Sequence, residues 1–72
     1  MENPLRKIRE ELGITINEMA LKLGVSYMTY FRAEKGMNLT VSPIIMKRLE
    51  KLDYDRDEIE QNYREWRESK AE

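Results

Sequence analysis

The chain has 72 residues, of which 40% are hydrophobic and 38% charged, so it has room for one small domain with a modest core. It contains no cysteine and no histidine, which excludes a disulfide framework, a thiolate metal site and a histidine general base. We therefore expect no enzyme, no cofactor and no bound metal. No apolar run approaches the roughly 20 residues that a membrane span needs, and the N-terminus lacks the apolar core of a signal peptide, so we expect a cytoplasmic protein without membrane contact.

The net charge of −1 is unevenly distributed along the chain. Residues 1–49 hold eight Lys or Arg against five acids, a net charge of +3, whereas residues 50–72 hold five against nine, a net charge of −4. A basic segment followed by an acidic one can orient a protein on DNA. Two solvated faces with no binding role would give the same pattern, so the charge alone leaves both interpretations open.

The first helix is predicted to begin at Pro4, because Asn3 is a good N-cap and proline is tolerated in the first helical turn. Gly13 is expected to end it. The apolar residues at helical spacing form its predicted buried stripe: Leu5, Ile8 and Leu12. Its basic residues lie on the other faces, where they can reach a phosphate backbone: Arg6, Lys7 and Arg9.

Residues 15–36 predict two short helices around a sharp turn at Gly24. Thr15 and Glu18 have the spacing of a capping box, in which each side chain bonds an unpaired amide at the start of a helix. Gly24 is the residue able to take positive φ at a helix end, and Ser26 is placed to cap the helix that follows. The segment therefore predicts helix, turn, helix.

Two further helices are predicted after this segment. Ser42 and Pro43 repeat the pattern of a cap followed by a first-turn proline, and Asp55 offers a cap for the last helix. In the loop before Ser42, either Leu39 or Val41 is expected to reach the core.

The last predicted helix carries one narrow apolar stripe on an otherwise charged surface, formed by Ile59, Tyr63 and Trp66. Such a stripe has to be buried, either against the chain's own first helix or against a second copy of the chain, and the sequence leaves both alternatives open. We expect no separate dimerisation domain, and aromatic residues are enriched at protein interfaces. These three residues are therefore the predicted dimer interface.

The combined pattern resembles the helix-turn-helix of the lambda-repressor and Cro-like, XRE-type, DNA-binding family. The resemblance covers roughly residues 4–60 and is carried by Leu5, Ile8, Arg9, Leu12, Gly13, Ile14, Thr15, Glu18, Ala20, Leu23, Gly24, Val25, Ser26, Glu34, Gly36, Leu49, Leu52, Asp57, Glu58 and Ile59. It implies an all-α bundle of five helices, and we assign the DNA-binding domain to residues 1–60. Relatives often end the fifth helix within about two turns, but the helix-favouring sequence continues here, so residues 56–72 are expected to form an extended C-terminal helix with a short acidic tail. The resemblance also implies that the third helix enters the major groove of double-stranded DNA.

Periodicity and resemblance together place the five helices at residues 4–12, 16–23, 27–35, 43–52 and 56–69. The predicted core consists of Leu5, Ile8, Leu12, Met19, Ala20, Leu23, Val25, Tyr30, Ala33, Ile45, Met46, Leu49, Leu52 and Ile59.

The resemblance assigns the DNA contacts to the outward side of the third helix and to its surroundings. The candidate residues are Asn17, Ser26, Tyr27, Met28, Phe31, Arg32, Lys35 and Asn38. Base edges are read by hydrogen bonds, yet this helix is largely apolar, and Arg32 is its one residue able to make a bidentate contact with guanine.

Three positions depart from the family's usual pattern, one of them being Tyr54, where relatives usually carry a small aliphatic residue. Ile16 stands where relatives commonly carry a phosphate-binding glutamine, so Asn17 and the free amides at that helix start are the expected replacement. Asp53 stands where relatives usually carry a glycine, so we expect a less tight turn there.

The function we expect is that of a sequence-specific DNA-binding transcriptional regulator of the phage or prokaryotic repressor type, with a possible homodimer on DNA. The alternative is a protein-binding module, an antirepressor or adaptor, that uses the apolar third helix to bind a protein partner. The charge distribution favours DNA, and the apolar surface of Tyr27, Met28 and Phe31 favours a protein.

Overall fold

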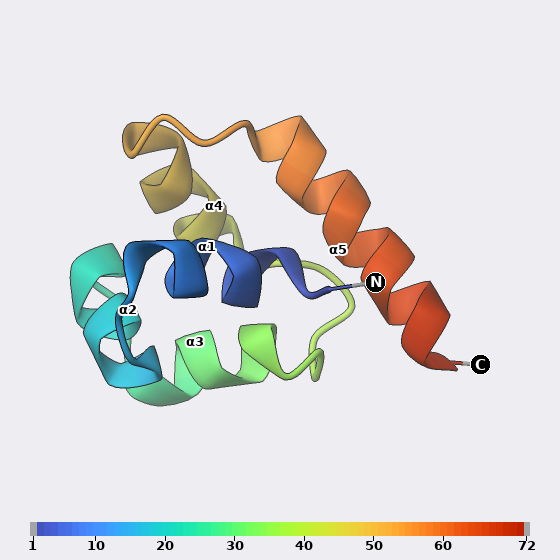
Figure 1. The fold of residues 1–72 in the computed structure, drawn as a ribbon, viewed down its shortest axis with the longest axis horizontal. Helices are drawn as coiled ribbons and strands as arrows, with labels where there is room; N and C mark the ends of the chain where they lie inside the picture. Colours follow the sequence, from blue (N-terminus) through green and yellow to red (C-terminus); the bar gives the residue numbers. More distant parts are fainter. Residues whose placement is uncertain (1, 72) are drawn as a thin grey trace.

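The structure, a computed structural model, describes residues 2–71 and is built from α-helices joined by short loops (Figure 1). The helices are α1 (Pro4–Leu12), α2 (Ile16–Leu23), α3 (Tyr27–Glu34), α4 (Pro43–Lys51) and α5 (Arg56–Ala71). These bounds confirm the predicted all-α, five-helix fold, and every predicted boundary lies within two residues of the observed one. Glu72, the last residue of the predicted acidic tail, lies outside the described residues.

Helix α1 is central to the arrangement, because it packs against α3 on one side and α5 on the other (Figure 1). Helices α2 and α3 form the closely packed helix-turn-helix pair, and α4 packs against both α2 and α5. None of the helices described for residues 2–71 is long and apolar enough to cross a membrane.

The starts of α1, α2 and α3 are set by local side-chain chemistry, as predicted. The Leu5 amide donates to Asn3 Oδ1 at 2.8 Å. Thr15 and Glu18 form both halves of a capping box, with the Thr15 amide 2.9 Å from Glu18 Oε1 and the Glu18 amide 3.1 Å from Thr15 Oγ1. These side chains satisfy amides that have no partner inside the helix, which fixes where each helix begins.

The two ends of α4 differ from what was expected. Ser42 makes no side-chain cap bond, so the fixed φ of Pro43 accounts for the start of α4. At the other end Asp53 takes a left-handed φ of +70°, its amide donates to the Glu50 carbonyl, and the Tyr54 amide donates to the Leu49 carbonyl. The expectation of a looser turn was wrong, because aspartate tolerates the left-handed conformation that glycine usually supplies.

The core contains most of the predicted residues. Its buried members are Leu5, Ile8, Met19, Ala20, Leu23, Tyr30, Ala33, Val41, Ile45, Met46, Leu49, Ile59, Tyr63 and Trp66. Val25 is half-buried against this cluster, and Val41, not Leu39, is the loop residue that enters it. Leu12 and Leu52 are exposed, contrary to prediction. Both stand at a helix end, Leu12 as the last residue of α1 and Leu52 just beyond α4, where the chain turns away from the packed face.

The apolar stripe on α5 is buried inside the single chain. Tyr63 is 1% exposed and Trp66 9%, and Ile59 belongs to the same cluster. The structure therefore takes the first of the two alternatives, since these side chains lie in the chain's own core. This corrects the expectation that the stripe forms a dimer interface, and a dimer would need another surface.

Candidate nucleic-acid interface

The outward side of α3 gathers five of the predicted contact residues into one surface, in which Phe31 is half-buried and the other four are exposed. We call it the α3 outer face, and it consists of Tyr27, Met28, Phe31, Arg32 and Lys35. The rings of Tyr27 and Phe31 stack with centroids 5.7 Å apart, and Lys35 Nζ lies 5.6 Å from the Phe31 centroid. Residues four apart share one side of a helix, so two aromatic rings and a cation form a continuous row along α3.

The one acid of α3, Glu34, is withdrawn from this surface. Its side chain is 3% exposed and accepts from Arg9, with Nη2 at 2.9 Å from Oε1 and Nε at 3.1 Å from Oε2. Because Glu34 faces α1, the charges left on the α3 outer face are the cations Arg32 and Lys35. The face is thus apolar with a positive charge toward its C-terminal end, and the α3 carboxylate does not lie on it to repel a polyanion.

Arg9 has a structural role that the sequence did not show. Its Nη1 also donates to the Ile14 carbonyl at 3.0 Å, and the hydrogen bond with Glu34 raises the pKa of Arg9. Asn3 Nδ2 donates to the Glu34 carbonyl, and Tyr30 Oη donates to the Leu5 carbonyl at 3.3 Å. The polar contacts between α1 and α3 therefore hold Arg9 away from the phosphate contact expected for the basic residues of α1.

Ser26 is engaged in capping α3. Its Oγ accepts from the Thr29 amide at 3.2 Å and lies 2.8 Å from Thr29 Oγ1. A hydroxyl held by two partners in its own helix is less available to a base edge. The structure thus gives Ser26 a definite role at the start of α3, next to Tyr27 on the outer face.

The start of α2 is less suited to a phosphate than expected. Asn17 is exposed there, as predicted, but the Glu18 carboxylate sits at the same helix start. The backbone N–H of Thr15, followed by its hydroxyl, lowers the pKa of Glu18, so the carboxylate is ionised at neutral pH. Its negative charge at the start of α2 disfavours a phosphate there.

Asn38 lies half-buried in the loop after α3. Its carbonyl accepts from Arg67 Nη1 at 2.7 Å and from Tyr63 Oη at 3.4 Å. The loop that follows the α3 outer face is therefore tied to α5 by its main chain.

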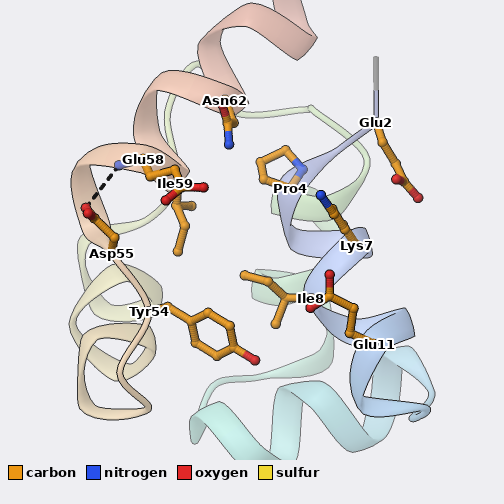
Figure 2. Close-up of a pocket in the computed structure, with 10 residues that line it drawn as sticks. All are labelled: Glu2, Pro4, Lys7, Ile8, Glu11, Tyr54, Asp55, Glu58, Ile59 and Asn62. Atoms are coloured by element: carbon orange, nitrogen blue, oxygen red, sulfur yellow. Dashed lines mark hydrogen bonds between the residues drawn. The ribbon is translucent and has the colours of Figure 1, made fainter.

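A hollow of about 330 Å³ lies between α1 and the start of α5 (Figure 2). Its apolar lining comes from Pro4, Ile8, Tyr54 and Ile59, and its charged lining from Lys7, Glu2, Glu11, Asp55 and Glu58. Four carboxylates against one ammonium make this groove unfavourable for a phosphate backbone. Over residues 2–71, no group of three or more acidic side chains is arranged to hold a metal ion. Of these two surfaces, the α3 outer face carries the charges that suit a polyanion better.

Comparison with known proteins identifies the family of the chain. Neither a search of curated proteins nor a search of solved structures returns a match. A helix-turn-helix family model, however, matches residues 5–59, which include all of α2, α3 and α4. The match spans more than half of the chain and confirms the resemblance found from the residues. The chain belongs to the XRE/lambda-repressor-like family of DNA-binding helix-turn-helix regulators.

Proposed function

We propose that the protein is a sequence-specific transcriptional regulator of the phage or prokaryotic repressor type that places the α3 outer face in the major groove. The observation that carries this proposal is the row formed by Tyr27, Phe31 and Lys35, with Arg32 beside it and the α3 carboxylate of Glu34 turned inward. An α-helix fits the major groove, where both hydrogen-bonding groups and thymine methyl groups are accessible.

The residues of the α3 outer face divide the recognition between them. Arg32 donates to the O6 and N7 acceptors of guanine, which is the strongest discriminating contact available to this face. Met28 and the aromatic rings contact thymine methyl groups, and Lys35 pairs with a phosphate. Because one helix reads only a few base pairs, two copies on half-sites about one helical turn apart would give a full operator.

A protein-binding role is the second candidate, and one observation favours it. Tyr27 is 45% exposed and Met28 47% exposed, so two large, mainly apolar side chains are accessible on the α3 outer face. Exposed apolar surface of this kind is typical of protein interfaces. On this alternative the protein acts as an antirepressor or adaptor and leaves DNA unbound.

Mobility-shift titration against genomic fragments at two salt concentrations separates the two candidates. A DNA regulator should shift a subset of fragments, with an affinity that falls as salt rises, because each phosphate contact releases condensed counterions. Few cations lie on the α3 outer face, so the salt slope should be shallow. Fragment-independent binding would exclude a sequence-specific regulator, and no binding to any fragment at low salt would favour the adaptor.

A further inference from the structure

The second half of α5 reaches the C-terminal end of α3, although the two helices are far apart in the sequence (Figure 1). The family model ends at residue 59, whereas α5 continues to Ala71. Residues 60–71 are therefore a part of this chain that the match does not describe. Their contacts with the end of α3 and with the following loop give them a role.

Tyr63 is the first residue of this contact. Its hydroxyl is buried and lies 2.7 Å from the Ala33 carbonyl in the last turn of α3, and 3.4 Å from the Asn38 carbonyl in the loop. Burial raises the pKa of Tyr63, so the hydroxyl keeps its proton and can donate. One side chain thus joins the last turn of α3 to a point five residues farther along.

Arg67 and Lys70 continue the contact along the next turn of α5. Arg67 Nη1 donates to the Gly36 carbonyl and, at 2.7 Å, to the Asn38 carbonyl. Lys70 Nζ lies 3.4 Å from the Lys35 carbonyl. Together with Tyr63, these side chains donate to main-chain carbonyls from the end of α3 through the loop.

The Ala33 carbonyl is one that a helix cannot satisfy by itself, and the Lys35, Gly36 and Asn38 carbonyls lie just beyond the last residue of α3. The last four carbonyls of an α-helix have no partner within it, and they are bonded by water, by the following turn or by other side chains. Here the following turn is closed by the Gly36 and Met37 amides, and α5 supplies the side-chain donors. The Trp66 ring lies against Gly36 in the same place. The end of α3 is thereby held on two sides.

We propose that residues 60–71 of α5 are a brace that fixes the end of α3 and residues 36–40 in the orientation needed to bind DNA. Tyr63 and Arg67 are positioning residues in this arrangement, since they act through the main chain of residues 33–38. The inference rests on the proposed function for its DNA part. Lys35 links the brace to DNA binding, because its carbonyl accepts from Lys70 on α5 while its own side chain belongs to the α3 outer face.

The brace is tested first without DNA. Tyr63→Phe removes the donor hydroxyl but keeps the ring and the net charge, and Arg67→Ala removes the second donor. Amide hydrogen exchange at Gly36 and Met37, whose amides donate to the Ala33 and Arg32 carbonyls, should quicken about three- to tenfold in both variants, in line with the loss of one hydrogen bond. Arg64→Ala removes the same charge from an exposed position of α5 and should leave exchange at Gly36 and Met37 unchanged. Equal exchange in all four proteins would overturn the brace.

The second arm measures DNA affinity on the fragment that the wild type shifts best, at a temperature where circular dichroism shows every variant folded. Tyr63→Phe should bind about threefold or more weakly with an unchanged salt slope, because Tyr63 touches no phosphate. Arg67→Lys should recover part of the affinity that Arg67→Ala loses, since lysine can still donate to the carbonyls, and Arg64→Ala should lose less than Arg67→Ala.

The two arms separate the possible failures. Wild-type affinity in Tyr63→Phe and Arg67→Ala, on a fragment that the wild type does bind, would overturn the positioning role and leave the proposed function intact. A wild type that shifts no fragment would refute the proposed function and, with it, the DNA part of the inference. Quickened exchange in that second case would leave α5 as a stabiliser of the fold alone.

Discussion

Gly36 lies directly against the indole ring of Trp66. A β-carbon built on Gly36 would come within 2.7 Å of both Cζ3 and Cη2 of Trp66, and Gly36 has a φ of +75°. Real β-carbons essentially never come that close to another atom, so a side chain at residue 36 would be strained by its φ and would force the Trp66 ring to move. The close approach lets Trp66 cover the end of α3.

Gly36→Ala should therefore destabilise the protein more than the same change at another left-handed glycine. Gly13 has a φ of +69° with nothing within 4 Å of its built β-carbon, which makes it a matched control. Gly13→Ala should cost about 1 kcal/mol, for the strained φ alone, and Gly36→Ala about 2–4 kcal/mol, because Trp66 must also move. Urea unfolding of the two variants gives the comparison. Equal losses in the free energy of unfolding would mean that the contact between Trp66 and Gly36 does not restrict residue 36.

Glu34→Ala should lower the free energy of unfolding by about 3–5 kcal/mol, because it leaves the Arg9 guanidinium largely buried without its carboxylate. The double change Arg9→Met with Glu34→Leu should restore much of that loss, since a buried ion pair can be replaced by apolar side chains. Glu10→Ala breaks the exposed pair with Arg6 and should stay within about 0.5 kcal/mol of the wild type. A small loss in Glu34→Ala would contradict the role given to this ion pair.

Ser26→Ala should cost about 1 kcal/mol of stability, because the Thr29 amide loses its acceptor at the start of α3. Ser26→Asp should keep the stability, as aspartate caps a helix equally well. It should nevertheless weaken DNA binding, since it adds a negative charge beside Tyr27 on the α3 outer face. Thermal unfolding and mobility shift, measured on both variants, separate the two effects. Undiminished DNA affinity in Ser26→Asp would place the DNA elsewhere.

Glu18 should make stability depend on pH in the acid range. Its pKa is lowered in the folded state, so its contribution is fully present above the pKa of the unfolded chain, about 4.3, and is lost as pH falls through the folded-state pKa. Glu18→Gln keeps the capping geometry but cannot titrate. Urea unfolding between about pH 6 and pH 3 should show a smaller loss in Glu18→Gln than in the wild type. Parallel curves for the two proteins would contradict this.

Arg32→Ala should weaken DNA binding and relax the preference at one base pair, by about 1–3 kcal/mol for the lost bidentate contact. Lys35→Ala should weaken binding to all sequences more evenly, because a phosphate contact carries no base information. Selection of bound fragments from a randomised pool, with each variant, distinguishes the two patterns. An unchanged base preference in Arg32→Ala would remove Arg32 from base recognition.

The sequence by itself determined the helices and most of the core. Asn3, Thr15 and Ser26 each bond an amide two or three residues away, so their effect is local and visible in the sequence. The α3 outer face also followed from the sequence, because helical spacing sets which residues share one side. The left-handed conformation at Asp53 was not predicted. We expected a looser turn because glycine is usual at that position, although aspartate also tolerates positive φ.

Tertiary structure decided which of the predicted side chains are free to act. Arg9 and Glu34 are 25 residues apart, and their pairing depends on how α1 packs against α3. The spacing of residues within each helix does not determine that packing. The same holds for the hydrogen bond from the Tyr63 hydroxyl to the Ala33 carbonyl, which joins residues 30 apart and accompanies the burial of the α5 stripe. An apolar stripe indicates that its side chains must be buried. Which surface covers them depends on how all five helices pack together, because the interior is close-packed.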